Sequence, residues 1–180
     1  MKITPSQLEN LLRRAIPARL PVLVTGSPGI GKTEICEQIA RECGCQTITL
    51  HPPTMDPTDM SGIPMPHDGK IIRMLDDTLM RIARADFPTV VILDELGQAP
   101  PSVQASCAPM LLARRLGSYE IPVHVTFLAT ANLRSDRAGS NHILTHLTSR
   151  FSTRVHLIPE PISWCDKATH DRVYWRVISH

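Results

Sequence analysis

The 180-residue chain is long enough for one domain, and its 42% hydrophobic residues can supply the core of a globular α/β domain. The formal net charge of +2 is too small to indicate nucleic-acid binding by itself, although eight histidines would add positive charge at mildly acidic pH. No stretch approaches the roughly 20 apolar residues of a membrane-spanning helix, which excludes an integral membrane protein. The five cysteines are scattered, with no C-x-x-C pair and no secretory leader, which favours a reduced cytoplasmic setting.

The first predicted elements are a helix, a strand and a second helix. Residues Thr4–Ile16 predict an amphipathic helix, because Thr4 can cap it, Pro5 suits its first turn, and apolar residues recur on one face. The apolar run Pro21–Val24 predicts a buried strand, and Thr33–Arg41 has the pattern of a helix. A phosphate-binding loop requires this order of strand, loop and helix.

The loop between that strand and that helix carries the strongest signal in the sequence. It reads Gly26-Ser27-Pro28-Gly29-Ile30-Gly31-Lys32-Thr33 and fits the pattern G-x-x-x-x-G-K-[ST] at every fixed position. Glycines let main-chain N–H groups face phosphate oxygens, Lys32 would place a charge between the β- and γ-phosphates, and the Thr33 hydroxyl would take one position around Mg²⁺. An ordinary glycine-rich turn does not need all three fixed elements, so we expect a nucleoside triphosphate to bind here. The expected cofactor-binding residues are Gly26, Ser27, Pro28, Gly29, Ile30, Gly31, Lys32, Thr33 and Glu34.

Two other groupings could suggest metal sites, but simpler interpretations are favoured. Cys43-Gly44-Cys45 lies where the helix should end at Gly44, and one intervening residue is a poor separation for two zinc thiolates, which favours structural cysteines. His142 and His146 could share a helix face, yet no third ligand accompanies them, which favours a solvated or hydrogen-bonded pair.

Predicted strands and helices alternate along the rest of the chain. Gln46–Leu50 alternates like a second strand, and Asp68-Gly69 between apolar flanks predicts a hairpin, followed by a helix from Asp76 to Ala85. The remaining predicted elements are a buried third strand over Thr89–Glu95, a helix over Ser102–Leu116 interrupted by Pro109, a turn or short hairpin over Gly117–Pro122, a fourth strand over Val123–Thr130 ending at Ala131-Asn132, a short helical segment before Ser149, and a fifth strand over Thr153–Ile158.

Polar residues stand at the ends of two of these strands. Asp94 and Glu95 end the third strand, and Asn132 follows the fourth. Because ligands of an open parallel sheet bind beyond the carboxyl ends of its strands, these residues should meet the loop at one crevice. There Asp94 can hold Mg²⁺ through water or through Thr33, and Glu95 can polarise the water that attacks the γ-phosphate. Acidic residues can also end a strand merely for solubility, but four preceding apolar residues and the complete loop favour catalysis.

Four features carry a resemblance to a known family: the phosphate loop, the strand Val90–Glu95, Asn132 and Ser149-Arg150-Phe151. Together they resemble an AAA+ ATPase over roughly residues 5 to 160. The segments Asp56–Gly62, Ala129–Asn132 and Leu147–Phe151 are similar, more narrowly, to the MoxR-like branch and to phage-encoded ATPases of that type.

The resemblance implies a fold and several residue roles. The fold is a P-loop core with a five-stranded parallel sheet in the order 5-1-4-3-2, flanked by helices. Asn132 would be the sensor that orients the attacking water. Arg150 would be an arginine finger acting on the nucleotide of a neighbouring subunit, and the alternative for it is a structural ion-pair partner. The segments around His67–Lys70 and Gly117–Ile121 would be hairpins facing a central pore where substrates are remodelled.

The family also carries a small helical lid after the fifth strand. Residues Trp164–His180 can supply only one helix, so the lid is expected to be absent or truncated. The expected domains are a nucleotide-binding core at 1–160 and a C-terminal helix at 161–180.

The function implied by the resemblance is Mg²⁺-dependent ATP hydrolysis by a homo-oligomeric, hexameric ring. Such a ring would remodel a protein client, for which a von Willebrand A-type protein is one candidate. A nucleic-acid motor or loader is the competing hypothesis, with little support, because the hairpin segments contain basic residues without interleaved aromatic ones. The third hypothesis is a module that binds the nucleotide without hydrolysing it. The preference for adenine rests on the resemblance alone.

Overall fold

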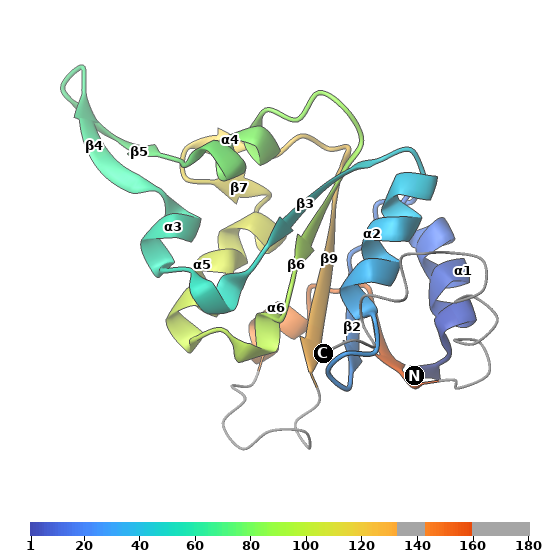
Figure 1. Cartoon of the computed structure of the whole chain (residues 1–180). Coiled ribbons are helices and arrows are strands. Elements are labelled where there is room, and N and C mark those ends of the chain that lie inside the picture. The colour runs from blue at the N-terminus through green and yellow to red at the C-terminus, as the bar shows by residue number, and fades with distance from the viewer. Residues whose placement is uncertain (133–142, 160–180) are drawn as a thin grey trace.

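The computed structural model describes residues 1–132 and 143–159, and a parallel sheet runs through its centre (Figure 1). Six strands lie in the order β1-β10-β2-β9-β6-β3, and every neighbouring pair is parallel. The strands are β1 (Lys2–Ile3), β2 (Val22–Gly26), β3 (Gln46–Leu50), β6 (Thr89–Leu93), β9 (Val125–Asn132) and β10 (Thr153–Leu157).

The sheet confirms the predicted strand order and corrects the predicted number of strands. The five predicted strands adopt the order 5-1-4-3-2 as β10-β2-β9-β6-β3. A sixth strand, β1, adds to the edge beside β10, where the N–H of His156 donates to the carbonyl oxygen of Met1 at 2.7 Å. Two residues are too few to show an alternating pattern, so the sequence gives no sign of this strand.

Helices cover both faces of the sheet (Figure 1). The helices α1 (Pro5–Ala15) and α2 (Lys32–Glu42) lie on one face, and α3 (Pro57–Ser61), α4 (Asp77–Ala83) and α5 (Pro101–Leu112) lie on the other. The short helix α6 (Thr145–Thr148) packs near α5, and two 3₁₀ turns, η1 (Pro52–Thr54) and η2 (Leu96–Gln98), follow β3 and β6.

The central strand β6 divides the core into two apolar clusters. Val90 and Ile92 join the cluster that includes the apolar faces of α1 and α2, whereas Val91 and Leu93 join the cluster on the α5 side. Successive side chains of a strand point to opposite faces, and a parallel strand covered by helices on both sides is therefore apolar throughout. This burial fixes the end of β6, and with it the position of the two acidic residues that follow.

The predicted helix over Ser102–Leu116 is too long by one turn. The observed α5 ends at Leu112, and Arg114 then takes a left-handed backbone with φ of 51°. Its guanidinium donates to the carbonyl oxygens of Pro122 at 2.5 Å and Val125 at 2.9 Å, which holds the turn away from the helix axis. The chain continues into a short hairpin of β7 (Arg115–Leu116) and β8 (Tyr119–Glu120), in the region where the sequence predicts a turn or hairpin.

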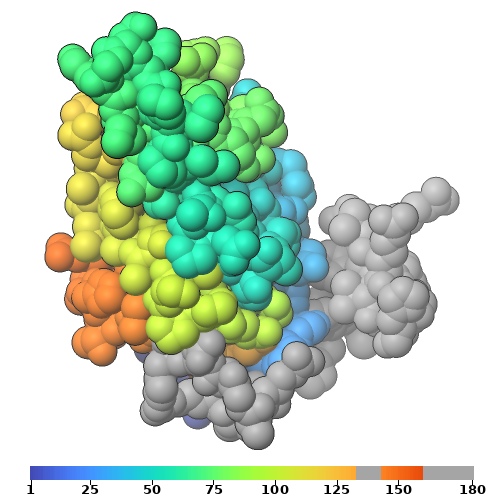
Figure 2. Space-filling model, turned by 90° about the vertical axis from the view of Figure 1, so that its left-hand side faces the viewer, coloured from blue at the N-terminus to red at the C-terminus, as the bar shows by residue number. Residues whose placement is uncertain are grey.

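A second hairpin projects from the body of the molecule, as Figures 1 and 2 show. It consists of β4 (Ile63–His67) and β5 (Lys70–Met74), joined at Asp68 and Gly69 with φ of 47° and 74°. Two left-handed residues are the requirement of the tight turn that Asp-Gly predicts.

Some predicted features fall on residues that the structure does not describe. His142, the C-terminal helix at 161–180 and the domain boundary at 160 lie outside the described residues. Within the described residues, no helix is long and apolar enough to cross a membrane.

Candidate nucleotide site

The phosphate loop joins β2 to α2, and its glycines shape it. Gly29 and Gly31 have φ of 73° and 77°, in the left-handed region that favours glycine. Gly31 is also the N-cap of α2, so the unpaired N–H groups of the first helical turn open into the loop. At Gly26 a Cβ would lie 2.9 Å from the carbonyl oxygen of Leu157, too close for any side chain. The result is a backbone cradle at a helix N-terminus, the arrangement that binds phosphate.

Lys32, the first residue of α2, is 7% exposed and reaches back across the loop. Its Nζ donates to the carbonyl oxygens of Gly26 at 3.1 Å and Ser27 at 2.8 Å, and to Oδ1 of Asn132 at 2.9 Å. These three acceptors are neutral oxygens, and together they orient the ammonium toward the loop. A cation held in this way, in partly dehydrated surroundings, attracts phosphate oxygens strongly.

Asp94 and Thr33 meet on the other side of the loop. The Thr33 hydroxyl donates to Oδ1 of Asp94 at 2.5 Å, and Nδ1 of His51 lies 3.5 Å from Oδ2 of the same carboxylate. Hydroxyl and carboxylate oxygens are ligands that Mg²⁺ accepts, so this pair fits the predicted metal site. Among the described residues no group of three or more His, Cys, Asp or Glu side chains could hold a metal alone. Two protein oxygens suit an ion that usually keeps several waters and shares substrate phosphates.

Glu95 follows Asp94 with an unusual backbone. Its φ of 54° and ψ of 33° are left-handed, which costs a non-glycine residue about 1–3 kcal/mol and recurs at functional sites. The N–H of Glu95 donates to Oγ1 of Thr130 at 3.0 Å, and its Oε1 accepts from Nδ2 of Asn132 at 3.4 Å. The Asn132 amide therefore contacts both Lys32 and Glu95, and links the phosphate side of the crevice to the acidic side.

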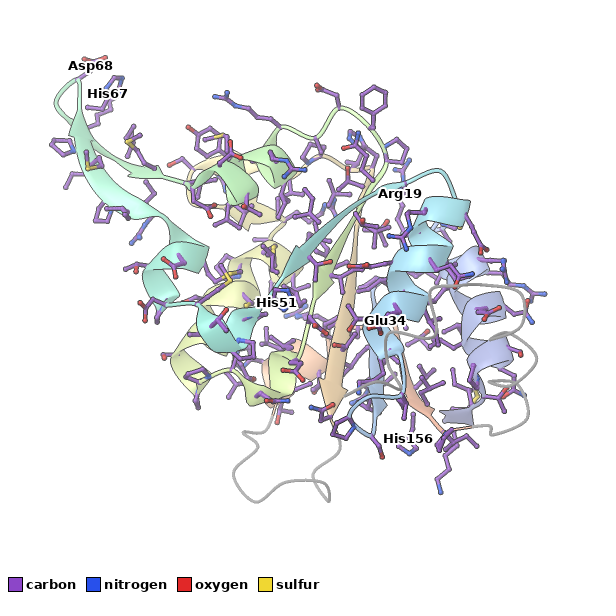
Figure 3. All side chains as sticks on the ribbon, in the orientation of Figure 1. Arg19, Glu34, His51, His67, Asp68 and His156 are labelled. Carbon is purple, nitrogen blue, oxygen red and sulfur yellow. The ribbon has the colours of Figure 1, made fainter. Side chains whose placement is uncertain are left out.

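These side chains share one crevice of about 140 Å³ at the carboxyl ends of β2, β6 and β9. It is lined by Pro28, Gly29, Gly31, Lys32, Thr33, Glu34, Asp94, Glu95 and Asn132. The other predicted loop residues lie beside it: Gly26 and Ser27 hold Lys32 through their carbonyl groups, and Ile30 packs into the core. Figure 3 shows Glu34 on α2 and His51 beyond the end of β3. The convergence that the sequence predicts at the strand ends is therefore present.

Arg150 does not join this group among the described residues. It lies just after α6, is exposed, and forms no ion pair with any side chain that the structure describes. Phe151, the next residue, is buried in the α5-side cluster and anchors the segment. Within the described residues, the Arg150 side chain therefore stands exposed on an anchored segment.

Two residues near the site, Thr130 and His51, were not predicted from the sequence as site residues. Thr130 contacts Asp94 and Glu95, and its signal is a hydroxyl in a mainly apolar strand, two residues before Asn132. His51 gives no such signal, because it stands at the end of a strand with no recognisable motif.

The cysteine on α2 lacks the thiolate character that nucleophilic chemistry requires. Burial, aided by the negative charge of Asp94, raises the pKa of Cys36 to about 12, so its thiol stays neutral at physiological pH. Burial likewise raises the pKa of Cys43 and of Cys45, which lowers the thiolate character that a metal site would need.

The sequence of this chain is similar to those of known proteins. The family model of the AAA domain, dynein-related subfamily, matches residues 21–151. Midasin of Giardia intestinalis is 26% identical over a match of 157 residues that covers 82% of this chain and 3% of midasin. The family match confirms the resemblance to AAA+ ATPases, with which the resemblance to the MoxR-like branch is consistent.

Solved structures of low sequence identity share the fold. A protein of Cytophaga hutchinsonii assigned as an ATPase superposes with a TM-score of 0.64 at 17% identity, covering 94% of this chain and 52% of its own. The RuvB Holliday junction branch migration motor of Thermotoga maritima superposes with a TM-score of 0.60 at 18% identity, covering 88% of this chain and 46% of the RuvB chain. NtrX of Brucella abortus, in complex with ADP, superposes with a TM-score of 0.59 at 16% identity, covering 84% of this chain and 34% of the NtrX chain. The chain thus spans about half or less of the length of each.

Proposed function

The chain belongs to the AAA domain family, in its dynein-related subfamily, and on this premise we propose that it is a Mg²⁺-dependent ATPase that remodels a protein partner. The observation that carries the ATPase part of the proposal is the crevice in which the Asn132 amide contacts both Lys32 and Glu95 while Thr33 contacts Asp94. AAA+ proteins commonly form oligomeric rings, and we extend the proposal to a homo-oligomer, a hexamer in the simplest case.

Each residue of the crevice has a proposed task. The loop N–H groups and Lys32 bind the β- and γ-phosphates, and Thr33 and Asp94 would hold Mg²⁺, which supplies charge neutralisation at those phosphates when bound. Glu95 accepts the proton of the attacking water, and the Asn132 amide orients that water beside Glu95. Arg150 reaches the γ-phosphate held by the next subunit of the ring.

Replacing Lys32 with alanine tests the nucleotide-binding part of this proposal. The change leaves the phosphates with backbone dipoles and Mg²⁺ alone, so the affinity for ATP should fall at least ~10-fold. Isothermal titration calorimetry measures the effect, with Lys2→Ala, an exposed lysine on β1, as the matched control. Unchanged affinity in Lys32→Ala would place nucleotide binding elsewhere.

The projecting hairpin favours a protein client over a nucleic acid. Ile63, Met65, Ile71 and Met74 on this hairpin are 44% to 79% exposed, and residues 63–74 contain no Phe, Tyr or Trp side chain on which a base could stack. The hairpin also carries Lys70 and Arg73, so a nucleic-acid motor or loader is the second candidate. A von Willebrand A-type protein is one client to test first.

ATPase measurements with and without DNA separate these candidates. For a protein remodeller we expect duplex and single-stranded DNA to change the rate by less than about twofold at both ~50 mM and ~200 mM salt, because phosphate contacts are few. Strong stimulation that is lost at the higher salt would favour the nucleic-acid motor. A chain that binds ATP but shows no basal turnover would be a nucleotide-binding module only.

A further inference from the structure

Two buried hydroxyl groups interrupt the apolar strand β9. Thr126 is 3% exposed and Thr130 is fully buried, and both lie on the same face of the strand because they are four positions apart, an even number. A buried hydroxyl needs hydrogen-bond partners to offset the loss of water. The Thr126 hydroxyl donates to the carbonyl oxygen of Ile16, just beyond α1, at 3.4 Å. The Thr130 hydroxyl instead has both its partners in the nucleotide site.

The Thr130 hydroxyl connects two adjacent residues of that site. It donates to Oδ1 of Asp94 at 2.5 Å and accepts the N–H of Glu95 at 3.0 Å. The register of the sheet explains this position, because Ala129 is the partner of Leu93 and Thr130 therefore stands beside the first residues beyond β6. One buried side chain thus holds the segment where the sheet ends and the site begins.

The two hydrogen bonds of the Thr130 hydroxyl hold the carboxylate of Asp94 and the backbone of Glu95. Oδ1 of Asp94 also accepts from Thr33, so two hydroxyl donors fix the rotation of that carboxylate and leave Oδ2 turned the other way. The bond to the N–H of Glu95 holds a backbone that is left-handed and otherwise unfavourable. That backbone directs the Glu95 carboxylate toward the amide of Asn132.

We propose that Thr130 is a positioning residue for ATP hydrolysis, which fixes the Asp94 carboxylate and the left-handed backbone of Glu95 through one hydroxyl. The proposal rests on the proposed function of the site. Thr130 is fully buried and does not line the crevice, so it acts through Asp94 and Glu95 and not on the nucleotide itself. Loss of its hydroxyl should therefore lower kcat and spare the affinity that the loop and Lys32 provide.

Three variants of the full chain test this inference. Thr130→Val keeps the shape of the side chain and removes the hydroxyl, Thr130→Ser keeps the hydroxyl, and Thr126→Val removes the other buried hydroxyl of the same strand. We expect Thr130→Val to lower kcat ~10²-fold, the effect of a small misplacement of catalytic groups, while the Kd for ATP changes by less than about threefold. Thr130→Ser should restore kcat to within about threefold of wild type, and Thr126→Val should keep it.

A second measurement does not depend on turnover. Amide hydrogen exchange, followed by NMR in the absence of nucleotide, should show the N–H of Glu95 protected at least ~10-fold in the wild-type chain and unprotected in Thr130→Val. Thr126→Val should keep the protection. Circular dichroism verifies folding, and Thr130→Ala removes the same hydroxyl if the valine variant does not fold.

Several results would overturn the inference. One is a Thr130→Val enzyme with wild-type kcat, another is a serine variant as slow as the valine one, and a third is a Glu95 amide that exchanges freely in the wild-type chain. If the wild-type chain hydrolyses no ATP, the proposed function fails, and the exchange experiment still decides whether Thr130 holds the Asp94–Glu95 segment.

Discussion

The Glu95→Gln variant should bind ATP with an affinity within about threefold of wild type and hydrolyse it at least ~10²-fold more slowly, the usual contribution of a general base. The amide keeps the shape of the side chain and its contact with Asn132, but it cannot accept the proton of the attacking water. Phosphate release under saturating ATP and Mg²⁺ gives the rate, and calorimetry gives the affinity.

The control for this variant is a carboxylate outside the crevice. Glu120→Gln changes an exposed residue of β8 and should leave both the rate and the affinity unchanged. Wild-type turnover in Glu95→Gln would show that another group activates the water. Loss of ATP binding in the same variant would show that Glu95 contributes to affinity, contrary to its proposed task.

Arg150→Ala should lower ATP hydrolysis by ~10³-fold or more and spare ATP binding, because an arginine finger acts on charge that develops in the transition state. In the described residues Arg150 is exposed and absent from the crevice of its own chain. Its proposed target is the γ-phosphate held by a neighbouring subunit, so the activity should depend on assembly. Arg154→Ala, an exposed arginine on β10, is the matched control.

Mixing two inactive variants tests whether the site is shared. Arg150→Ala retains an intact phosphate loop, and Lys32→Ala retains an intact arginine. Mixed rings can place the intact arginine beside the intact loop, so partial activity should return on mixing. The experiment is performed where the wild-type chain sediments as a ring. If mixing restores nothing and Arg150→Ala alone turns over ATP, Arg150 is a structural residue and the shared-site mechanism fails.

The sequence was sufficient for most of the fold because the signals are local and strong. The short, β-branched apolar run of β6 is typical of a strand buried on both faces, and the glycine pattern between β2 and α2 is typical of a phosphate loop. The strand order came from the family resemblance, since periodicity alone cannot say which parallel strands are neighbours. The structure adds the edge strand β1, which is too short for any pattern.

The sequence was less informative where long-range contacts decide the structure. The end of α5 depends on the Arg114 guanidinium, which bonds to carbonyl groups of residues eight and eleven positions further on. The motif and the positions of the strands were enough to predict that Lys32, Asp94, Glu95 and Asn132 meet in one crevice. The contacts of Thr130 were not, because they depend on the register between β9 and β6 and on the left-handed backbone of Glu95.

A crystal structure of the Glu95→Gln variant grown with ATP and Mg²⁺ would show directly whether the loop and the strand ends form one nucleotide site. We expect an intact ATP molecule with its phosphates in the loop from Gly26 to Thr33, its terminal phosphates against Lys32, and a metal ion beside Thr33 and Asp94. A nucleotide bound away from Lys32, or a loop that remains empty at saturating ATP, would contradict it.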